Sequence, residues 1–165
     1  MSKAKDTDAT HVLTADHRTV EDLFAKYENA AGLERKRALA DKICIELKIH
    51  SQIEEEIFYP ALTGKIDADQ LSEAYVEHDG AKFLINEIER GGPDEEFYDA
   101  KIMVLKEQIE HHVNEEEKQR DNMFQQARAA DVDLDELGKR LLSRKDELQE
   151  KAKREGLPPA KMITL

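Results

Sequence analysis

The feature that most constrains this chain is a set of four apolar stripes, each of which contains one histidine. Along each stripe the inward residues recur at intervals of three and four positions, which is the period of one helix face. Few β-branched alternations interrupt these segments, and this favours helix over strand. We therefore predict an all-α fold, an up-down four-helix bundle with an additional C-terminal helix. The stripes run over Leu13–Tyr27, Leu39–Ala61, Leu71–Ile88 and Ile102–Glu116.

Glycines and prolines separate the helical segments. Gly32, Gly64, Gly91 and Gly156 each follow one such segment, as C-terminal helix caps do. We expect a bundle domain over residues 10–130 and a helix over residues 131–155 that packs on the bundle or on a second copy in a homodimer. Residues 156–165 are expected to form a flexible tail, and residues 1 to about 9 to be frayed.

Composition excludes some partners, whereas the pattern of the apolar residues decides between folding and disorder. Charged residues make up 38% of the chain, hydrophobic residues 39%, and the net charge is −12. That balance is compatible with disorder, but the helical placement of the apolar residues predicts a core. The acidic excess repels phosphate backbones and anionic lipid, so we expect neither a nucleic-acid nor a membrane partner. A single cysteine, Cys44, and an N-terminus without a long apolar stretch predict a soluble cytoplasmic protein.

The four histidines lie at similar distances from the turns between helices. His50 lies 14 residues before Gly64, and His78 lies 14 residues after it. In an antiparallel bundle such residues share one layer of the core. His17 and His112 fall within about one helical turn of the same layer. We therefore expect the four imidazoles to converge.

Two of the stripes add a glutamate one turn after the histidine. Residues at i and i+4 lie on the same helix face, so each of these helices presents an imidazole and a carboxylate to the core. Burial of an unpaired carboxylate costs several kcal/mol, which predicts a cation in this layer. A pair of metal ions meets the demand, and imidazole with bridging carboxylate suits iron. The candidate ligands are His17, His50, Glu54, His78, His112 and Glu116.

Two further residues compete for a place in the site. His111 and Glu115 repeat the same spacing one position earlier, which leaves a second register open. His112 with Glu116 is favoured because His112 continues an apolar stripe, whereas the stripe of His111 is polar. Lys82, in the third stripe, is a candidate outer hydrogen-bond partner of the ligands or part of the ligand pocket. A lone histidine in an apolar stripe is more often a hydrogen-bonded core residue, but four in register favour metal.

The sequence around these residues resembles the hemerythrin-like, or HHE cation-binding, domain. The matching runs read ADHRTVEDLF, HSQIEEEIFYPAL, EHDGAKFL and HHVNEEE, within about residues 10 to 130. The resemblance implies a four-helix bundle around a non-haem di-iron centre with an oxo or hydroxo bridge. By position, His17 and His50 would bind one iron, His78 and His112 the other, and Glu54 and Glu116 would bridge both.

Departures from the family's pattern bear on function. Oxygen-carrying hemerythrins have a further histidine one turn after the third-helix ligand, where this chain has Lys82. In those proteins the last acidic ligand also lies five residues after its histidine, whereas Glu116 lies four residues after His112. We therefore expect binding of oxygen, nitric oxide or hydrogen peroxide for sensing or stress protection rather than reversible oxygen carriage. The alternatives are a di-iron enzyme that decomposes peroxide or nitric oxide, an iron-responsive folding switch, and a metal-free interaction module.

Overall fold

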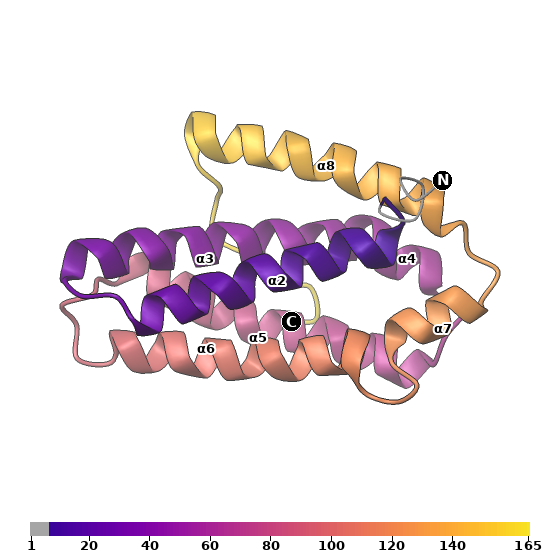
Figure 1. Cartoon of the computed structure of the whole chain (residues 1–165), viewed down its shortest axis with the longest axis horizontal. Helices are drawn as coiled ribbons and strands as arrows, with labels where there is room; N and C mark the ends of the chain where they lie inside the picture. Colours follow the sequence, from indigo (N-terminus) through magenta and orange to yellow (C-terminus); the bar gives the residue numbers. More distant parts are fainter. Residues whose placement is uncertain (1–6) are drawn as a thin grey trace.

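A computed structural model describes residues 7–165 of the chain. Four long helices form an up-down bundle (Figure 1), and residues 7–165 contain no β-strand. The predicted all-α bundle is thereby confirmed, while most of the frayed N-terminal segment lies outside the described residues. The bundle helices are α2 (Ala9–Glu28), α3 (Leu33–Ile53), α5 (Ala68–Arg90) and α6 (Tyr98–Val113).

Short turns place consecutive helices antiparallel. Gly32 precedes α3 with a φ of 87°, a left-handed conformation that glycine adopts without a steric penalty. Before α5, the Asp67 side chain accepts a hydrogen bond from the backbone N–H of Gln70, as an N-cap residue does. These turns set the height at which the polar residues of neighbouring helices meet.

Both helices that carry a histidine and a glutamate widen into a π-helical turn at the glutamate. α3 continues into η1 (Glu54–Phe58) and the short helix α4 (Tyr59–Leu62), and α6 continues into η2 (Asn114–Lys118). The backbone N–H of Tyr59 donates to the carbonyl of Glu54, and that of Gln119 donates to the carbonyl of Asn114 at 2.9 Å. Such five-residue bonds widen the helix and change which residues face inward, and they occur frequently at functional sites.

The apolar core consists of two clusters, one on each side of the histidine layer. One cluster gathers Leu13, Ile53, Phe58, Leu62 and Phe124, and the other gathers Val20, Phe24, Ile43, Ile85 and Leu105. Every polar group in the layer between them is thus cut off from water along the bundle axis.

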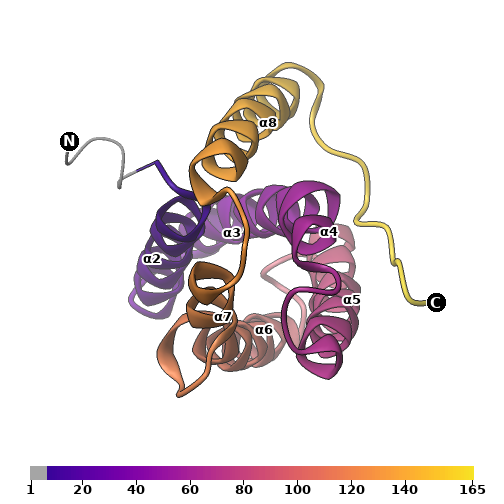
Figure 2. The same cartoon turned by 90° about the vertical axis from the view of Figure 1, so that its right-hand side faces the viewer.

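The C-terminal part adds two helices outside the four-helix core. α7 (Met123–Ala129) begins with a capping box, and α8 (Leu134–Glu155) lies across α2 and α3 (Figures 1 and 2). Gly138 permits the close approach, because a Cβ there would lie 1.7 Å from the carbonyl oxygen of Thr7. The face of α8 that meets the bundle buries three of its own leucines, Leu137, Leu141 and Leu148. α8 therefore packs on its own bundle, and the homodimer stays a prediction.

Residues 156–165 leave α8 and run beside α5 (Figure 2). Asn86 donates to the carbonyl of Ala160 at 3.0 Å and accepts from its N–H at 2.8 Å. Asp79 accepts from the backbone N–H of Ile163 and of Thr164. The flexibility of this tail stays a prediction, whereas its course along the bundle is defined by these contacts.

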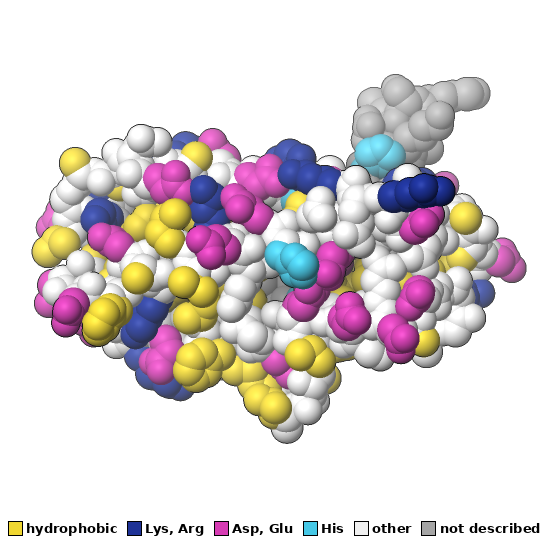
Figure 3. All heavy atoms as spheres, turned by 90° about the horizontal axis from the view of Figure 1, so that it is seen from below, with side chains coloured by type: hydrophobic (Ala, Val, Ile, Leu, Met, Phe, Trp, Pro, Cys, Tyr) yellow, Lys and Arg dark blue, Asp and Glu magenta, His cyan; other side chains and the backbone are white. Residues whose placement is uncertain are grey.

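On the face drawn in Figure 3, acidic and basic side chains are interspersed with apolar ones. In residues 7–165 we find no helix with the length and apolar character that crossing a bilayer requires.

Candidate metal centre

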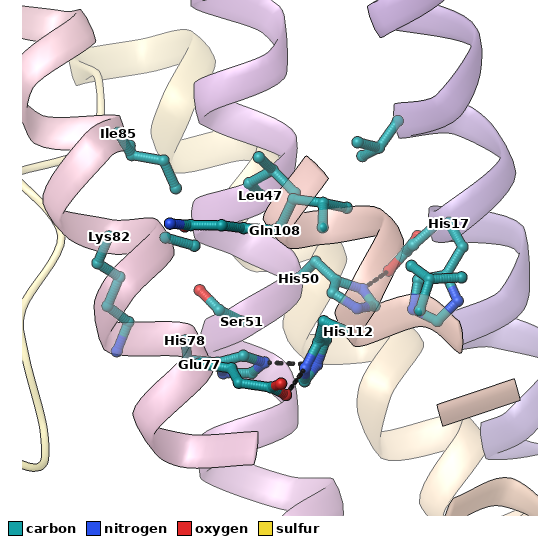
Figure 4. Close-up of a pocket in the computed structure, with 15 residues that line it drawn as sticks. His17, Leu47, His50, Ser51, Glu77, His78, Lys82, Ile85, Gln108 and His112 are labelled. Carbon is teal, nitrogen blue, oxygen red and sulfur yellow. Dashed lines mark hydrogen bonds and ion pairs between the residues drawn. The ribbon is translucent and has the colours of Figure 1, made fainter. Parts of the chain in front are cut away.

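The structure brings all six candidate ligands into one buried layer. The four histidine rings converge between the bundle helices (Figure 4). Both glutamates are 0% exposed, and each histidine is at most 7% exposed. The ligands come from α2 (His17), the end of α3 (His50), η1 (Glu54), α5 (His78), the end of α6 (His112) and η2 (Glu116).

Each glutamate lies between one histidine of each predicted pair. A carboxylate placed in this way is suited to bridge two cations. The distances are 3.0 Å from Glu54 Oε1 to His50 Nε2, 3.3 Å from the same oxygen to His78 Nε2, 3.2 Å from Glu116 Oε1 to His17 Nε2 and 3.3 Å from Glu116 Oε2 to His112 Nε2.

Many of the inward-facing atoms lack a hydrogen bond. Although the contacts above lie at ion-pair distance, several have no hydrogen-bond geometry. Buried polar atoms are nearly always paired, so such a cluster asks for a partner. Imidazole nitrogens and carboxylate oxygens are donors that transition metals accept, and the residues present therefore fit a metal pair. Among the described residues, the unpaired atoms of this layer are His17 Nε2, His50 Nε2, both carboxylate oxygens of Glu54 and Glu116 Oε1.

Electrostatics in the layer favour positive charge. Burial lowers the pKa of His50, but the facing charges of Glu54 and Asp16 outweigh it and hold that pKa well above its usual value. Burial likewise opposes the raised pKa of His112, which Glu116 causes. Burial would raise the pKa of Glu116, yet His112 holds it well below its usual range. The carboxylates thus attract a cation strongly, whether it is a proton or a metal ion.

The outer nitrogen of every histidine contacts a further carboxylate. Such partners fix the ring orientation and the tautomer, so that Nε2 remains free toward the interior. The Nδ1 distances are 3.1 Å from His17 to Glu117, 2.9 Å from His50 to Asp16, 2.7 Å from His78 to Glu55 and 2.8 Å from His112 to Glu77.

Sequence reasoning missed these four acids because they lie off the apolar stripes. A usable signal was present, since each acid directly adjoins a candidate ligand in the sequence. Asp16 and Glu77 precede histidines, whereas Glu55 and Glu117 follow the layer's glutamates. The π-helical turns help to bring the latter two inward.

Tyr59 is a further residue that sequence reasoning missed. Its fully buried hydroxyl donates to Glu116 Oε2 at 2.8 Å, and it lies 3.1 Å from His78 Nε2 and 3.2 Å from His112 Nε2. Burial and the Glu116 carboxylate hold its pKa well above the usual value. The His78 and His112 pair therefore has an additional oxygen beside it.

A small cavity adjoins the histidines. Its volume is about 30 Å³, and a single water needs about 10–15 Å³, so the cavity has room for a diatomic molecule. All four histidines line it, together with the apolar side chains of Val20, Leu47, Ala81, Ile85, Ile109 and Val113.

Lys82 also lines this cavity, but its ammonium group is engaged elsewhere. It donates to Glu55 Oε1 at 2.7 Å and to the carbonyl oxygen of Lys161 at 2.9 Å. Its role toward a bound ligand stays a prediction. Glu55 also contacts His78, so Lys82 is connected to this histidine through a single intervening side chain.

The competing register faces solvent. His111 has a side chain that is 65% exposed, and its Nε2 lies 2.8 Å from Glu115 and 3.2 Å from Glu77. His112, and not His111, lies in the buried layer. Cys44 is buried, and burial raises the pKa of its thiol to about 12.

Comparison with known proteins agrees with this geometry. The chain is 26% identical over 142 residues to the uncharacterized protein Rv2633c of Mycobacterium tuberculosis, a match that covers 86% of this chain and 87% of that protein. A solved structure, the hemerythrin HHE cation-binding domain-containing Rv2633c homolog from Mycobacterium kansasii, superposes with a TM-score of 0.74 at 27% identity. The match covers 91% of this chain and 94% of the Mycobacterium kansasii chain.

A DNA nickase of a Nostoc species is 24% identical over 116 residues, which are 70% of this chain and 33% of that protein. The sequence model of the hemerythrin HHE cation-binding domain matches residues 8–120. This range includes all six candidate ligands and spans the four bundle helices. The chain therefore belongs to the hemerythrin HHE cation-binding domain family.

Proposed function

We propose that this chain binds two iron ions, joined by an oxo or hydroxo bridge, in the histidine layer. The observation that carries the proposal is the set of unpaired, inward-facing nitrogen and oxygen atoms that α2, α3 with its continuation η1, and η2 contribute. His17 and His50 would hold one ion, His78 and His112 the other, and Glu54 and Glu116 would lie between them. When bound, the iron pair supplies electron transfer and a Lewis acid for a small ligand.

We propose further that the ligand is oxygen, nitric oxide or hydrogen peroxide, bound for sensing or stress protection. The apolar part of the cavity lining favours small neutral molecules over anions, which lose solvation there without recovering it. A volume of about 30 Å³ excludes larger substrates. The charged sequence and the single cysteine support a cytoplasmic location.

A larger groove supports a route to the cavity. It has a volume of about 680 Å³ and is lined by residues of α3, α5, α8 and the tail. Ser51 and Lys82 line both the groove and the cavity. We propose that small ligands enter between these two side chains.

A peroxide- or nitric-oxide-consuming enzyme is the second candidate, and Tyr59 favours it. Its hydroxyl oxygen lies 2.8 Å from Glu116 Oε2, to which it donates its proton in a hydrogen bond inside the layer. A group in this position can donate a proton to a reduced oxygen or nitrogen species. Sustained oxygen release from peroxide would support the enzyme, whereas bleaching that stops after one equivalent would support the sensor.

Metal analysis with anaerobic Fe(II) addition tests the proposal. We expect two irons per chain and a clear gain in thermal stability, because metal binding to a folded site stabilises the fold. Less than one equivalent of iron, with no gain in stability, would contradict both the di-iron site and the iron-responsive switch. Parallel additions of Zn²⁺ and Mn²⁺ test selectivity, since affinity order alone does not select iron.

A further inference from the structure

Two chains of contacts lead from the C-terminal part of the molecule to the outer nitrogens of the histidine layer. We propose that the C-terminal segment, residues 134–165, holds His50 and His78 in their ligand orientation through these contacts. Lys145 and Lys82 are then positioning residues of the metal centre. The proposal rests on the ligand set of the proposed function and adds to it a part for a segment beyond residues 8–120, which the family model matches.

The first chain of contacts starts on α8. Lys145 Nζ donates to Asp16 Oδ1 at 2.5 Å, and Asp16 Oδ2 lies 2.9 Å from His50 Nδ1. Asp16 is 3% exposed, so its charge depends on these two partners rather than on water. Lys145 orients the carboxylate through this contact, and the carboxylate in turn fixes the His50 ring.

The second chain of contacts starts on the tail. The carbonyl oxygen of Lys161 accepts from Lys82 Nζ at 2.9 Å, and the same ammonium donates to Glu55 Oε1 at 2.7 Å. Glu55 Oε2 lies 2.7 Å from His78 Nδ1. The Lys82 and Glu55 side chains are both nearly fully buried, which makes their charge-assisted bond strong.

The tail carbonyl is itself held in place on both sides. Ala160, the residue before Lys161, exchanges two hydrogen bonds with Asn86. Two residues after Lys161, the N–H of Ile163 donates to Asp79 at 2.9 Å. The tail thus meets α5 at fixed points around the carbonyl that Lys82 uses.

Within residues 7–165, His17 and His112 have no such connection to the C-terminal segment. The Glu117 partner of His17 pairs with Arg18 of α2, and the Glu77 partner of His112 pairs with exposed His111 of α6. The C-terminal segment therefore reaches one histidine of each proposed metal pair. Loss of either lysine should loosen one metal position and leave the other histidine of that pair in place.

The test compares Lys145→Met and Lys82→Met with two matched controls in the full chain. Arg144→Met alters the neighbouring residue on α8, which pairs only with Glu56 and Glu147 among the described residues. Lys36→Met removes a part-buried lysine that binds the carboxylate of Asp99 and, within residues 7–165, contacts neither a candidate ligand, nor its outer acid, nor the tail. All variants are loaded with Co²⁺ or Fe(II) and then challenged with a chelator.

We expect metal loss to be about tenfold faster in Lys145→Met and Lys82→Met, the size of effect typical when an outer partner of a metal-bound histidine is removed. Both controls should keep the wild-type rate. In the Co²⁺-loaded protein, the shifted proton resonance of one imidazole N–H should exchange faster with water in each lysine variant. Lys145→Arg should restore both the rate and the resonance.

Wild-type rates and resonances in both lysine variants would overturn the proposal and leave the di-iron site standing. A wild-type chain that binds no metal would overturn both. Asn86→Ala provides a milder change if Lys82→Met unfolds, because it releases the tail without touching Glu55. We expect it to speed metal loss as well, and an unchanged rate in a folded Asn86→Ala would overturn the part given to the tail.

Discussion

The two halves of the bundle, α2 with α3 and α5 with α6, present the same order of polar residues. Each half has an acid directly before its first histidine, and then a second histidine followed four and five positions later by glutamates. The residues are Asp16, His17, His50, Glu54 and Glu55 in the first half, and Glu77, His78, His112, Glu116 and Glu117 in the second.

The contacts of the two halves also correspond. In each half, the acid before the first histidine contacts the second histidine of the same half, as Asp16 does with His50. The last glutamate of each half contacts the first histidine of the other half, as Glu55 does with His78. The halves therefore interlock, and neither forms a complete histidine pair with its outer partners alone.

The halves differ in what surrounds this shared frame. Beside the His78 and His112 pair lies the hydroxyl of Tyr59. Beside the other pair, the Phe124 ring stacks on His17 with 6.0 Å between ring centroids. One proposed metal position thus has an extra oxygen beside it, and the other has an aromatic ring. A symmetric set of ligands can therefore offer two chemically distinct positions.

The strongest test of the shared frame is removal of the residues that join the halves. Glu54→Ala and Glu116→Ala should each lower the iron content to about half or less, because each deletes a carboxylate that lies between the two proposed metal positions. Glu115→Ala, one residue from Glu116, should leave iron near normal. Normal iron in Glu54→Ala with loss in Glu115→Ala would show that the histidine register is wrong.

A change of pH should separate the metal-free and metal-loaded proteins. The raised pKa values of His50 and His112, one from each half, stabilise the metal-free fold below pH 6.5, and this stability is lost as pH rises through the folded pKa. Metal binding requires deprotonated imidazoles, so the loaded protein should gain stability over the same range. Denaturant midpoints measured with and without metal check this. Parallel pH profiles would contradict it.

Removal of the Tyr59 hydroxyl should reduce the difference between the halves. Tyr59→Phe keeps the ring in its buried site and takes the oxygen away from His78 and His112, so we expect bound iron to persist with a changed optical spectrum. Phe124→Leu is the counterpart in the other half, and we expect a smaller spectral change because no donor atom is lost. Equal changes in both variants would argue against distinct metal positions.

The smallest effect is expected at the surface. Arg18 pairs with Glu117, but the arginine side chain is 48% exposed. Exposed ion pairs contribute about 0.2–1 kcal/mol. Arg18→Ala should therefore lower the free energy of unfolding by less than about 1 kcal/mol and leave metal content unchanged, in contrast to Lys145 of α8, which is 21% exposed and pairs with the buried Asp16 of the first half. A large loss of metal would show that Glu117 depends on this pair.

The helical period predicted the frame of this molecule well. Four stripes of spacing three and four identified the bundle helices, and matching distances from the turns identified a layer that the structure assembles. The outer acids escaped prediction because a period of 3.6 residues turns Glu55 and Glu117 away, whereas the π-helical turns change which residues face inward. Tyr59 was missed for the same reason.

The C-terminal contacts could not be predicted from local pattern. Lys145 is one of several lysines on a polar helix, and only the packing of α8 on the bundle brings it to Asp16. The tail is held by backbone groups, which leave no trace in a sequence. The residues that reach the site through long-range contacts are therefore the part of the site that only a structure reveals.

Anomalous X-ray scattering at the iron edge, from crystals of protein loaded anaerobically with Fe(II), tests the central claim most directly. Two iron peaks are expected inside the bundle, one beside His17 and His50 and one beside His78 and His112, with Glu54 and Glu116 between them. A single peak in the layer, or a peak at the surface cluster of Glu77, His111 and Glu115, would contradict the account.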